Sequence, residues 1–425
     1  MQKQLIIWNW RVNMITMLAP KDKPLISIDE LLSPDLLKTE NLPTFSELSI
    51  NFLAQLSNKI FEVKHITNFP ELVALAYWIR KTNISTIIKN FSKEISSSEI
   101  ITPRGVAFHI APSNVDSIFL YSWALSLLVG NINIVRISQN VGSQLALLLL
   151  FINDLMKEEQ WNEIKKRNFI VTYPHDDQIN SVLSANCDIR ILWGGDETIN
   201  KIRKFPSKAT TKEIPFADKF SYTIIDSSKY LALNDYRKEQ LAKQFYNDAY
   251  WFDQMACSSP RFVYFTGSKK KNTLASKTFW FLLETELVNR EKSDSMGIAM
   301  NKLVHLYETA STSNSMQFTT GLSIIKPTVV RIPKIDINKF RDNCGGGFFY
   351  ECFLESIDNL AELVQSNDQT LSYFGFSKSK LKNFIKKVNG KGVDRVVPIG
   401  QALQFDQIWD GYSLLSELTR KIALR

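Results

Sequence analysis

Hydrophobic and polar positions along the chain follow two different periods. Over residues 46–79 apolar residues recur at helical spacing, as in Phe52, Leu56 and Ile60, and this spacing predicts amphipathic helices. From residue 100 onward, apolar runs of strand length alternate with longer apolar segments of helical length. Strands that alternate with helices of roughly 10–15 residues indicate βαβ units and a parallel sheet. The pattern therefore predicts an α/β fold.

Two successive series of such units are predicted. The first has strands at 105–111, 131–137, 168–172 and 187–193 and helices at 117–129 and 142–156. The second has strands at 222–225, 262–265 and 328–332, a further strand-like segment after residue 347, and helices at 235–250 and 273–288. No linker rich in Pro or Gly separates the two series. We therefore expect two closely packed domains with a boundary near 230–250.

Composition and charge exclude only a few classes of protein. Of 425 residues, 44% are hydrophobic and 22% are charged, which excludes wholesale disorder. The formal net charge of +8 is mild for this length and fits an anionic ligand, a nucleic acid or no charged partner at all. Lysine clusters such as 269–271 have no interleaved aromatic residues and are interpreted as solvated faces, so no nucleic-acid partner is predicted.

Several site classes lack support in the sequence. The apolar stretches 118–130 and 145–152 fall short of the roughly 18 residues that a membrane span needs, and residues 1–20 have no continuous apolar core of a secretory signal. A cytoplasmic protein without a membrane span is expected. Four scattered histidines predict no metal site. No CxxC pair occurs among the cysteines, which are expected to be reduced: Cys187, Cys257, Cys344 and Cys352.

Cys257 is the candidate nucleophile. It follows a predicted helix and precedes a predicted strand, and its neighbours Ser258, Ser259 and Pro260 suit an exposed turn where a thiolate can meet a substrate. From this pattern alone, an inert structural cysteine remains the alternative. That role suits Cys187 and Cys352, which lie in apolar segments, whereas Cys344, before three glycines, fits either role.

Three other positions lie where predicted parallel strands end, the edge at which ligands of such sheets bind. The side-chain amide of Asn114 could donate a hydrogen bond to a developing oxyanion, or it could serve as a helix N-cap. Gly194 and Gly195 could let backbone N–H groups approach a diphosphate, or they could serve the turn alone. Arg136 could bind an anion or be an ordinary cation at a strand end.

Several separated blocks, taken in order, resemble the acyl-CoA reductase family within the aldehyde dehydrogenase superfamily. That family includes the reductase subunit of the bacterial luminescence fatty-acid reductase. The blocks are residues 109–114, 131–136, 193–197, 253–258, 344–349, 368–375, 394–403 and 409–412. This likeness covers the chain from about residue 100 to its end.

The resemblance implies an aldehyde dehydrogenase-like fold with two packed Rossmann-like α/β domains, mainly parallel sheets and a C-terminal oligomerisation segment. A mostly helical segment of residues 1–95 would pack on an NADP-binding domain of residues 96–240. Residues 241–392 would form the catalytic domain with the nucleophilic cysteine. Residues 393–425 would serve oligomerisation, so a homo-oligomer is expected.

The resemblance also implies a reaction. NADPH would reduce a fatty or other acyl thioester, carried on CoA or on a carrier protein, to the aldehyde through an acyl-cysteine. Cys257 would be the nucleophile and Asn114 the oxyanion donor. An acyl-activating or acyl-transfer protein is an expected partner. Gln254 and His109 lie within the same blocks and are alternatives for tuning the thiol or binding CoA.

The resemblance assigns cofactor roles as well. Arg136 and Ser138 would lie at the adenosine ribose, where an arginine suits the 2′-phosphate of NADPH. Gly194 and Gly195 would lie against the diphosphate. The superfamily binds its nicotinamide nucleotide without a GxGxxG motif, so the absence of that motif from this sequence is compatible with the assignment.

Two departures from the superfamily pattern bear on the reaction. The oxidising members have a general-base Glu, but the matching region here, residues 215–220, reads Pro-Phe-Ala-Asp-Lys-Phe, and the later block at 345–349 reads Gly-Gly-Gly-Phe-Phe. Aldehyde oxidation needs a base to activate water, and thioester reduction does not. The alternatives are a cysteine-dependent acyltransferase on the same fold that performs no reduction, and a non-catalytic relative.

Overall fold

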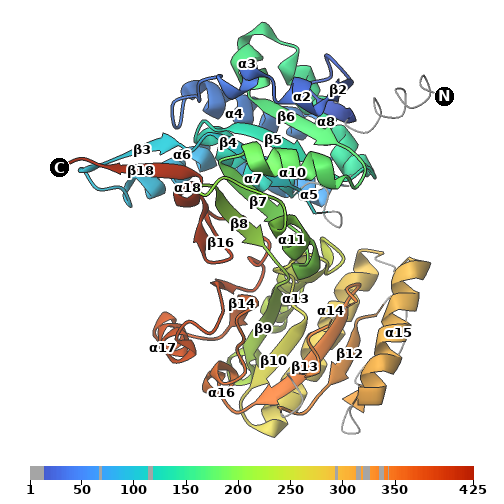
Figure 1. Ribbon diagram of the computed structural model, residues 1–425. Helices are drawn as coiled ribbons and strands as arrows, with labels where there is room; N and C mark the ends of the chain where they lie inside the picture. The colour runs from blue at the N-terminus through green and yellow to red at the C-terminus, as the bar shows by residue number, and fades with distance from the viewer. Residues whose placement is uncertain are drawn as a thin grey trace. The chain divides into compact units, whose positions relative to one another are not determined.

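The computed structural model describes residues 14–66, 69–112, 118–291, 295–312, 317–318, 326–334, 339–342 and 344–425. These residues form two compact units. Unit 1 contains the described residues up to Ala217 together with Phe405–Arg425, and unit 2 contains those within Asp218–Gln404. Each unit is built on a mainly parallel sheet (Figure 1). The predicted α/β class is confirmed.

The sheet of unit 1 has the strand order β2-β1-β6-β5-β4-β7-β8. From β6 to β8 the neighbouring strands pair in parallel, and β1 pairs antiparallel with β6 and β2. The strands are β1 (Met14–Ala19), β2 (Leu25–Ser27), β4 (Val106–Ile110), β5 (Ile132–Arg136), β6 (Asn168–Thr172), β7 (Ile189–Trp193) and β8 (Lys212–Phe216). The helices are α2 (Ile28–Leu31), α3 (Pro34–Leu37), α4 (Glu47–Phe61), α5 (Pro70–Trp78), α6 (Lys81–Ser92), α7 (Phe119–Leu128), α8 (Ser143–Met156), the short 3₁₀ turn η2 (Glu159–Trp161), α9 (Asn162–Lys165), α10 (Asp177–Asn186), α11 (Asp196–Arg203) and α18 (Leu414–Glu417).

Helices cover both faces of this sheet. One apolar core contains buried residues of α4 to α8, and the other contains buried residues of α2, α10 and α11. Along β5, Ile134 belongs to one core and its neighbour Val135 to the other. Since both faces are buried, the strands read in the sequence as continuous apolar runs.

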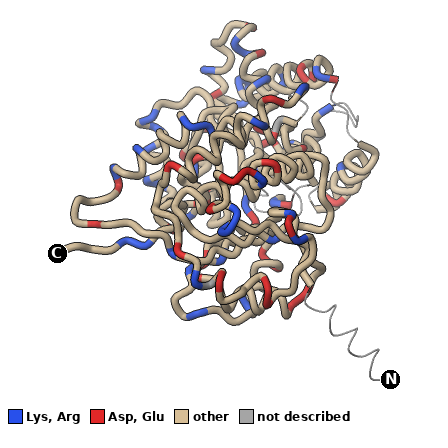
Figure 2. Tube along the Cα trace, turned by 90° about the horizontal axis from the view of Figure 1, so that it is seen from above, with Lys and Arg blue, Asp and Glu red and all other residues tan. Residues whose placement is uncertain are grey.

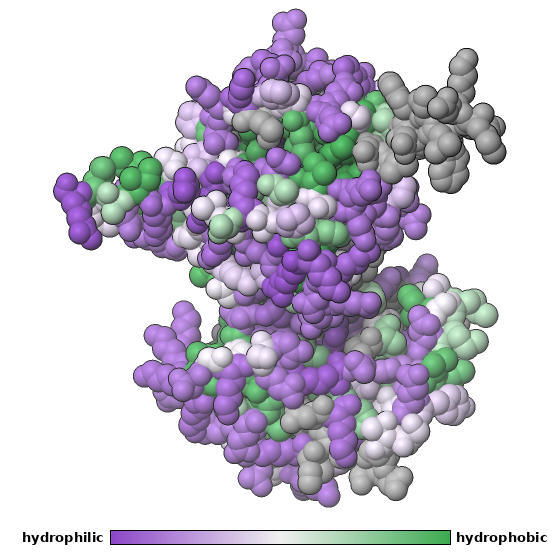
Figure 3. Space-filling view, in the orientation of Figure 1, coloured by the Kyte–Doolittle hydropathy of each residue, from purple (hydrophilic) through white to green (hydrophobic). Residues whose placement is uncertain are grey.

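The chain returns to unit 1 at its C-terminal end. There Phe405 stacks on Tyr121 with ring centroids 5.1 Å apart, and Asn131 Nδ2 donates to the Leu418 carbonyl at 3.0 Å. The small strands are β3 (Glu99–Pro103), β16 (Ile408–Trp409), β17 (Tyr412–Ser413) and β18 (Thr419–Ala423). The antiparallel β3–β18 ribbon (Figure 1) exposes Ile100 and Ile422, and Figure 3 shows hydrophobic surface towards its end. The homo-oligomer expected through this segment stays a prediction.

The sheet of unit 2 has the order β11-β12-β13-β10-β9-β14-β15, and only the edge strand β11 is antiparallel to its neighbour among the described strands. The strands are β9 (Phe220–Asp226), β10 (Phe262–Thr266), β11 (Gln317–Phe318), β12 (Thr328–Arg331), β13 (Phe348–Leu354), β14 (Asp368–Phe374) and β15 (Arg395–Pro398). The helices are α12 (Ser227–Leu231), α13 (Asp235–Tyr250), α14 (Lys269–Asn289), α15 (Met296–Thr312), α16 (Ile357–Ala361) and α17 (Lys378–Val388). One core contains buried residues of α12 to α14, and the other those of α15 to α17.

The units divide the chain differently from the domains expected from the sequence. The expected boundary at 240/241 falls inside α13, and the units divide instead at Ala217 and Asp218. The reason is that β9 pairs with β10 and β14, so its ladders belong to unit 2. Residues before 96 contribute strands β1 and β2 to the sheet of unit 1 in addition to helices, and the return to unit 1 begins at Phe405 rather than at residue 393.

Charged side chains are distributed over both units. Figure 2 shows Lys and Arg interspersed with Asp and Glu along the chain, and many are paired, as in Lys166–Glu163 and Lys334–Glu362. Such exposed pairs contribute little stability. Within the part of the chain that the structure describes, no helix is long and apolar enough to cross a membrane.

Asp248 on α13 fastens the segment that follows β15. Its two carboxylate oxygens accept the N–H groups of Gly400 at 2.7 Å and Ala402 at 2.9 Å. The residue is buried, and burial raises its pKa to about 7, although both backbone donors oppose that rise. The carboxyl group of Asp248 therefore titrates near neutral pH.

The raised pKa makes a prediction about stability. Between pH 3.8, the ordinary value, and about 7 the folded state keeps a proton on Asp248 that the unfolded state has lost. The contribution of Asp248 to the free energy of unfolding is therefore greatest below about pH 4, falls as the pH rises to about 7, and is constant above that. Urea unfolding of the wild type and Asp248→Asn across pH 4–8 checks this. The difference between them should change over this window; a difference independent of pH contradicts the prediction.

Candidate functional site

A cavity of about 510 Å³ in unit 1 opens where β4 and β5 end. The strand order places β4 between β5 and β7. The chain therefore continues towards β5 on one side of β4 and towards β7 on the other, which makes this a topological switch point of the sheet. Ligands of open α/β sheets bind at such points. Ile110 and Arg136, the last residues of β4 and β5, line the cavity. The other lining residues are His175, Asn180, Glu197, Thr198, Lys201 and Ile202.

The cavity suits an anionic group. Arg136, His175 and Lys201 line it against the single carboxylate of Glu197 among the lining residues. Lys201 pairs with Asp177 at 3.0 Å, whereas the buried Nε of Arg136 has no hydrogen-bond partner. A buried donor without a partner costs free energy, and a bound anion would remove that cost.

The remaining predicted cofactor residues of unit 1 lie close in sequence to residues that line this cavity, but they do not line it themselves. Ser138 Oγ accepts the N–H of Asn140 at 3.3 Å in the turn after β5. The Gly194 N–H donates to the Phe216 carbonyl at 3.2 Å and so continues the sheet. Gly195 is the N-cap of α11. The diphosphate role of the two glycines stays a prediction.

Two further predicted residues of unit 1 have different outcomes. Asn114 lies outside the described residues, in the connection between β4 and α7. His109 is fully buried, with Nδ1 3.2 Å from Ser122 Oγ and Nε2 3.1 Å from Asn133 Oδ1. Burial lowers its pKa to about 4. His109 is therefore a neutral core residue at pH 7.

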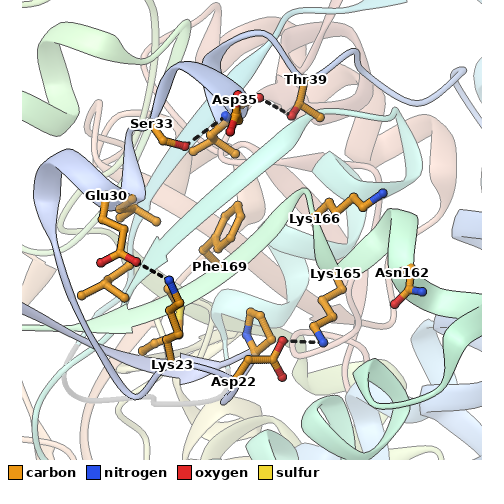
Figure 4. A pocket seen from close by; sticks show the side chains of 15 residues that line it. Asp22, Lys23, Glu30, Ser33, Asp35, Thr39, Asn162, Lys165, Lys166 and Phe169 are labelled. Atoms are coloured by element: carbon orange, nitrogen blue, oxygen red, sulfur yellow. Dashed lines mark hydrogen bonds and ion pairs between the residues drawn. The ribbon is translucent and has the colours of Figure 1, made fainter.

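A larger cavity of about 660 Å³ lies elsewhere in unit 1 (Figure 4). It is lined by residues of the N-terminal segment, by Asn162, Lys165 and Lys166 around α9, and by Phe169, near the amino end of β6. Figure 4 shows charged side chains at its rim paired with each other, Lys23 with Glu30 at 2.6 Å and Lys165 with Asp22 at 2.5 Å. Because this larger cavity lies at the amino end of a parallel strand and most of its charged side chains are paired, we favour the smaller cavity as the ligand site.

In unit 2, Cys257 lies in the turn between α13 and β10. This turn meets a second one, Gly345 to Gly347, because β10 and β13 are adjacent parallel strands and both turns lie at their amino ends. The Gly346 N–H donates to the Asp253 carbonyl at 2.7 Å. The fold thus brings together two sequence blocks about 90 residues apart.

Gln254 joins the two turns. It is buried, and its Nε2 donates to the carbonyls of Pro260 at 2.8 Å and Phe348 at 2.9 Å. Its Oε1 accepts the Gly347 N–H at 3.0 Å. All its polar atoms therefore contact backbone, and Gln254 holds the shape of the cysteine turn rather than reaching a ligand.

The second turn requires its glycines. All three have positive φ, 72°, 64° and 81°. A Cβ on Gly347 would lie 2.2 Å from the Tyr250 hydroxyl, and one on Gly345 would lie 2.6 Å from Met255 Sδ. Both the backbone conformation and the close packing exclude larger residues.

Ser221 fixes the backbone of Cys257 from the neighbouring strand β9. Its buried hydroxyl donates to the Cys257 carbonyl at 2.6 Å and accepts the Thr370 N–H at 3.2 Å. Its carbonyl accepts the Arg261 N–H at 2.9 Å. Ser221 thus ties the turn to β9, and the same hydroxyl is held in place by β14.

The cysteines fall into two classes. Cys187 and Cys352 are buried, and burial raises the pKa of each thiol to about 12. Cys257 and Cys344 are only partly buried. One expectation was wrong: Ser258 and Ser259, predicted in an exposed turn, are buried at 2% and 0% exposure, because the turn packs against the glycine turn. Cys257 itself is only partly buried.

Sequence reasoning missed several residues of these sites. His175 and Lys201 line the cavity with Arg136, and their signal was their position soon after β6 and β7. Ser221, which binds the Cys257 carbonyl, was missed as well because it lies 36 residues away in the sequence. No group of three or more His, Cys, Asp or Glu within the described ranges could hold a metal ion.

Comparison with known proteins identifies the family to which this chain is related. The family described as acyl-CoA reductase (LuxC) matches residues 43–294. The long-chain acyl-protein thioester reductase of Vibrio harveyi is 23% identical over 309 residues, which cover 70% of this chain and 59% of the relative. That of Aliivibrio fischeri is 27% identical over 167 residues, 39% of this chain and 33% of the relative. The chain thus spans less than two thirds of the length of these relatives.

Solved structures share the fold. Aldehyde dehydrogenase 21 of Physcomitrella patens, in complex with succinate, matches with a TM-score of 0.66 at 12% identity over 97% of this chain and 94% of that chain. The NAD+ complex of a Bacillus cereus aldehyde dehydrogenase gives 0.65 at 13% identity over 99% and 98%. These likenesses establish the aldehyde dehydrogenase-like fold.

Proposed function

Because this chain belongs to the acyl-CoA reductase (LuxC) family, we propose that it reduces acyl thioesters to aldehydes with NADPH and that Cys257 is the nucleophile. The observation that carries the proposal is the rigid turn that holds a partly accessible Cys257. Ser221 and the glycine turn hold this turn in place. By contrast, Cys187 and Cys352 are buried. Thiol nucleophiles suit acyl transfer, since the thiolate reacts readily with carbonyl carbon.

In the proposed reaction, the Cys257 sulfur attacks the carbonyl carbon of the thioester. A carbon–sulfur bond to Cys257 forms, the bond to the original thiol breaks, and that thiol leaves with a proton. Reduction of the acyl-cysteine gives a thiohemiacetal, whose bond to Cys257 then breaks to release the aldehyde and restore the thiolate. One thioester, one NADPH and one proton are converted to one aldehyde, one thiol and one NADP+.

The cavity of unit 1 is the proposed cofactor site. When bound, NADPH supplies the hydride. Arg136, with its unpartnered Nε, and His175 would hold an anionic group of the nucleotide. The proposal assigns that group as the 2′-phosphate and keeps Ser138, Gly194 and Gly195 at the ribose and diphosphate. Asn114 is the proposed oxyanion donor.

The names of the relatives indicate the substrate class. Both are long-chain acyl-protein thioester reductases, so we propose a long-chain acyl group as the substrate, delivered by an acyl-transfer protein or as its CoA thioester. We also propose a cytoplasmic homo-oligomer. The test is NADPH oxidation by the purified chain against acyl-CoAs of varied length, with aldehyde detected as product. Aldehyde from long-chain thioesters supports the function; no oxidation with any thioester, including acylated protein, contradicts it.

Arg136→Gln is expected to raise KM for NADPH by about 10- to 100-fold and to leave KM for NADH within about threefold. The reason is that a charge-assisted hydrogen bond contributes about 1.5–3 kcal/mol, and each 1.4 kcal/mol is about tenfold in affinity. Initial-rate kinetics with both nucleotides measure the effect. Lys204→Gln, an exposed residue at the end of α11 outside the cavity, is the charge-matched control. An equal rise in KM for NADPH and for NADH would instead place Arg136 at a part of the nucleotide that the two cofactors share.

A further inference from the structure

The helix α14 (Lys269–Asn289) of unit 2 has an apolar stripe on its outer side. Its inner side is fixed to the strands: Trp280 Nε1 donates to the buried Glu351 of β13 at 2.8 Å, and Asn272 Nδ2 donates to the Leu354 carbonyl at 3.1 Å. These bonds set the rotation of the helix, so the opposite side faces solvent. The large apolar side chains on that side are Leu274, Phe281 and Val288, exposed at 55%, 66% and 56%.

The three members of the stripe lie nearly in line along the helix axis. Successive members are seven residues apart, close to two helical turns, and the stripe runs for about 21 Å at 1.5 Å per residue. Single exposed apolar residues are common, but a contiguous row on one helix indicates an interaction surface. Because the row is straight, all three side chains can enter a flat apolar layer to the same depth.

Lysines flank this stripe in the amino-terminal half of α14. Lys270 and Lys277 each precede a member of the stripe by four residues, and Lys271 precedes Leu274 by three, so each lies next to the stripe on the helix surface. All three lysines are exposed. Lys271 Nζ donates to the hydroxyl of Ser228 at 3.1 Å, which is a neutral partner. The outer side of α14 therefore combines an apolar row with positive charge.

The acidic residues of α14 are paired with other cations. Glu284 pairs with Lys326 and Glu286 with Arg290, each at 2.5 Å. In a two-fold contact between copies of this chain the same surface would face itself, so α14 of one copy would offer no free carboxylate to the lysines of the other. The charge of this side is instead complementary to an anionic surface from outside the chain.

We propose that the outer side of α14 docks on an anionic lipid bilayer, with Leu274, Phe281 and Val288 inserted between the headgroups and the flanking lysines at the lipid phosphates. A helix with an apolar row and basic flanks lies in the plane of such an interface, and lysines near an anionic leaflet add electrostatic attraction. A bilayer supplies both the flat apolar layer and the negative charge that this side fits. The inference goes beyond the proposed function and does not depend on it.

The test is co-sedimentation of the purified full chain with lipid vesicles. We expect binding to vesicles of phosphatidylglycerol and phosphatidylcholine in equal parts, and binding at least about tenfold weaker to phosphatidylcholine alone, because each lysine near an anionic surface contributes about fivefold. A triple variant without the flanking lysines should bind the anionic vesicles about 100-fold more weakly: Lys270→Gln, Lys271→Gln and Lys277→Gln. A triple variant without the stripe should lose binding to both kinds of vesicle: Leu274→Ala, Phe281→Ala and Val288→Ala.

Two matched triple variants of unit 2 are the controls. The first removes three exposed lysines from α17, which belongs to the core on the other face of the sheet: Lys378→Gln, Lys382→Gln and Lys386→Gln. The second removes exposed apolar residues from α15, whose one lysine, Lys302, is buried: Met300→Ala, Val304→Ala and Tyr307→Ala. Both should bind anionic vesicles within about threefold of the wild type.

Three results would overturn the inference. One is a wild-type chain that binds neither kind of vesicle. Another is wild-type binding by both α14 variants, shown to be folded by circular dichroism and thermal unfolding. The third is a stripe variant that dissociates an oligomer in light scattering while the wild type stays off vesicles, which would assign the stripe to a contact between copies. Sedimentation uses neither thioester nor nucleotide, so vesicle binding without reductase activity would refute the proposed function and leave this inference intact.

Discussion

Cys257→Ala is expected to abolish thioester-dependent NADPH oxidation, with a rate lower by roughly 10⁴-fold or more, as is usual when a covalent nucleophile is removed. The acyl-enzyme should be lost as well. Incubation of the wild type with a long-chain acyl-CoA in the absence of NADPH should add one acyl mass to the peptide that contains Cys257, and the variant should show no such adduct. Intact-mass and peptide mass spectrometry together with NADPH absorbance make both measurements.

The substitution should leave the rest of the protein unchanged. Ser221 contacts the backbone carbonyl of Cys257 rather than its side chain, so alanine keeps that hydrogen bond. The cavity with Arg136 belongs to unit 1, so NADPH affinity should be retained.

Cys344→Ala is the matched control, since Cys344 is the other partly buried cysteine. It should keep both the adduct at Cys257 and the activity to within a few-fold. Retention of adduct and turnover by Cys257→Ala would refute the assignment. A wild-type adduct that passes to an acceptor without NADPH oxidation would identify the acyltransferase alternative.

Asn114→Ala is expected to lower kcat by about 10²- to 10³-fold, the usual effect of removing one donor to an oxyanion. The amide would stabilise negative charge on the carbonyl oxygen both when Cys257 attacks and when the acyl group is reduced. The dissociation constant of NADPH, measured by fluorescence titration, should stay within about threefold, because Arg136 and His175 are unchanged.

Asn186→Ala is the control for loss of an asparagine from unit 1. Its side chain donates only to the Val182 carbonyl at 2.8 Å, at the end of α10, so wild-type kcat is expected. Weakened NADPH binding by Asn114→Ala with unchanged kcat would assign the amide to the cofactor site and would remove it from the chemical step.

Much of the fold follows from local sequence signals. The predicted strand at 168–172 and helix at 235–250 coincide with β6 and α13, because a doubly buried strand and an amphipathic helix leave distinct patterns. The Asn234 side chain caps α13 by accepting the Arg237 N–H at 2.9 Å. The edge strands β2 and β8 were missed, since short edge strands lack a long apolar run and are specified by their neighbours in the sheet. Strand β1, which lies between β2 and β6, was missed as well.

The residues of the candidate sites also differ in whether the sequence alone could identify them. Cys257 and Arg136 could be singled out because a thiol in a turn and a cation at the end of a parallel strand are local features. Gln254 could not be assigned correctly, since its partners Phe348 and Gly347 lie more than 90 residues away. The same holds for Ser221, which reaches the Cys257 carbonyl from another strand.

The sequence by itself determined the α/β class, several of the parallel strands and longer helices of both units, the likeness to the acyl-CoA reductases and Cys257 as the nucleophile candidate. These depend on periodicity, turn chemistry and the order of blocks, all of which are written locally along the chain. Tertiary structure alone decided that the chain divides at residue 217, that the glycine turn packs against the cysteine turn, and that Gln254 joins these two turns through backbone groups. The reason is physical: strand pairing and burial join residues far apart in sequence, and the charge balance of a buried group depends on every element packed around it.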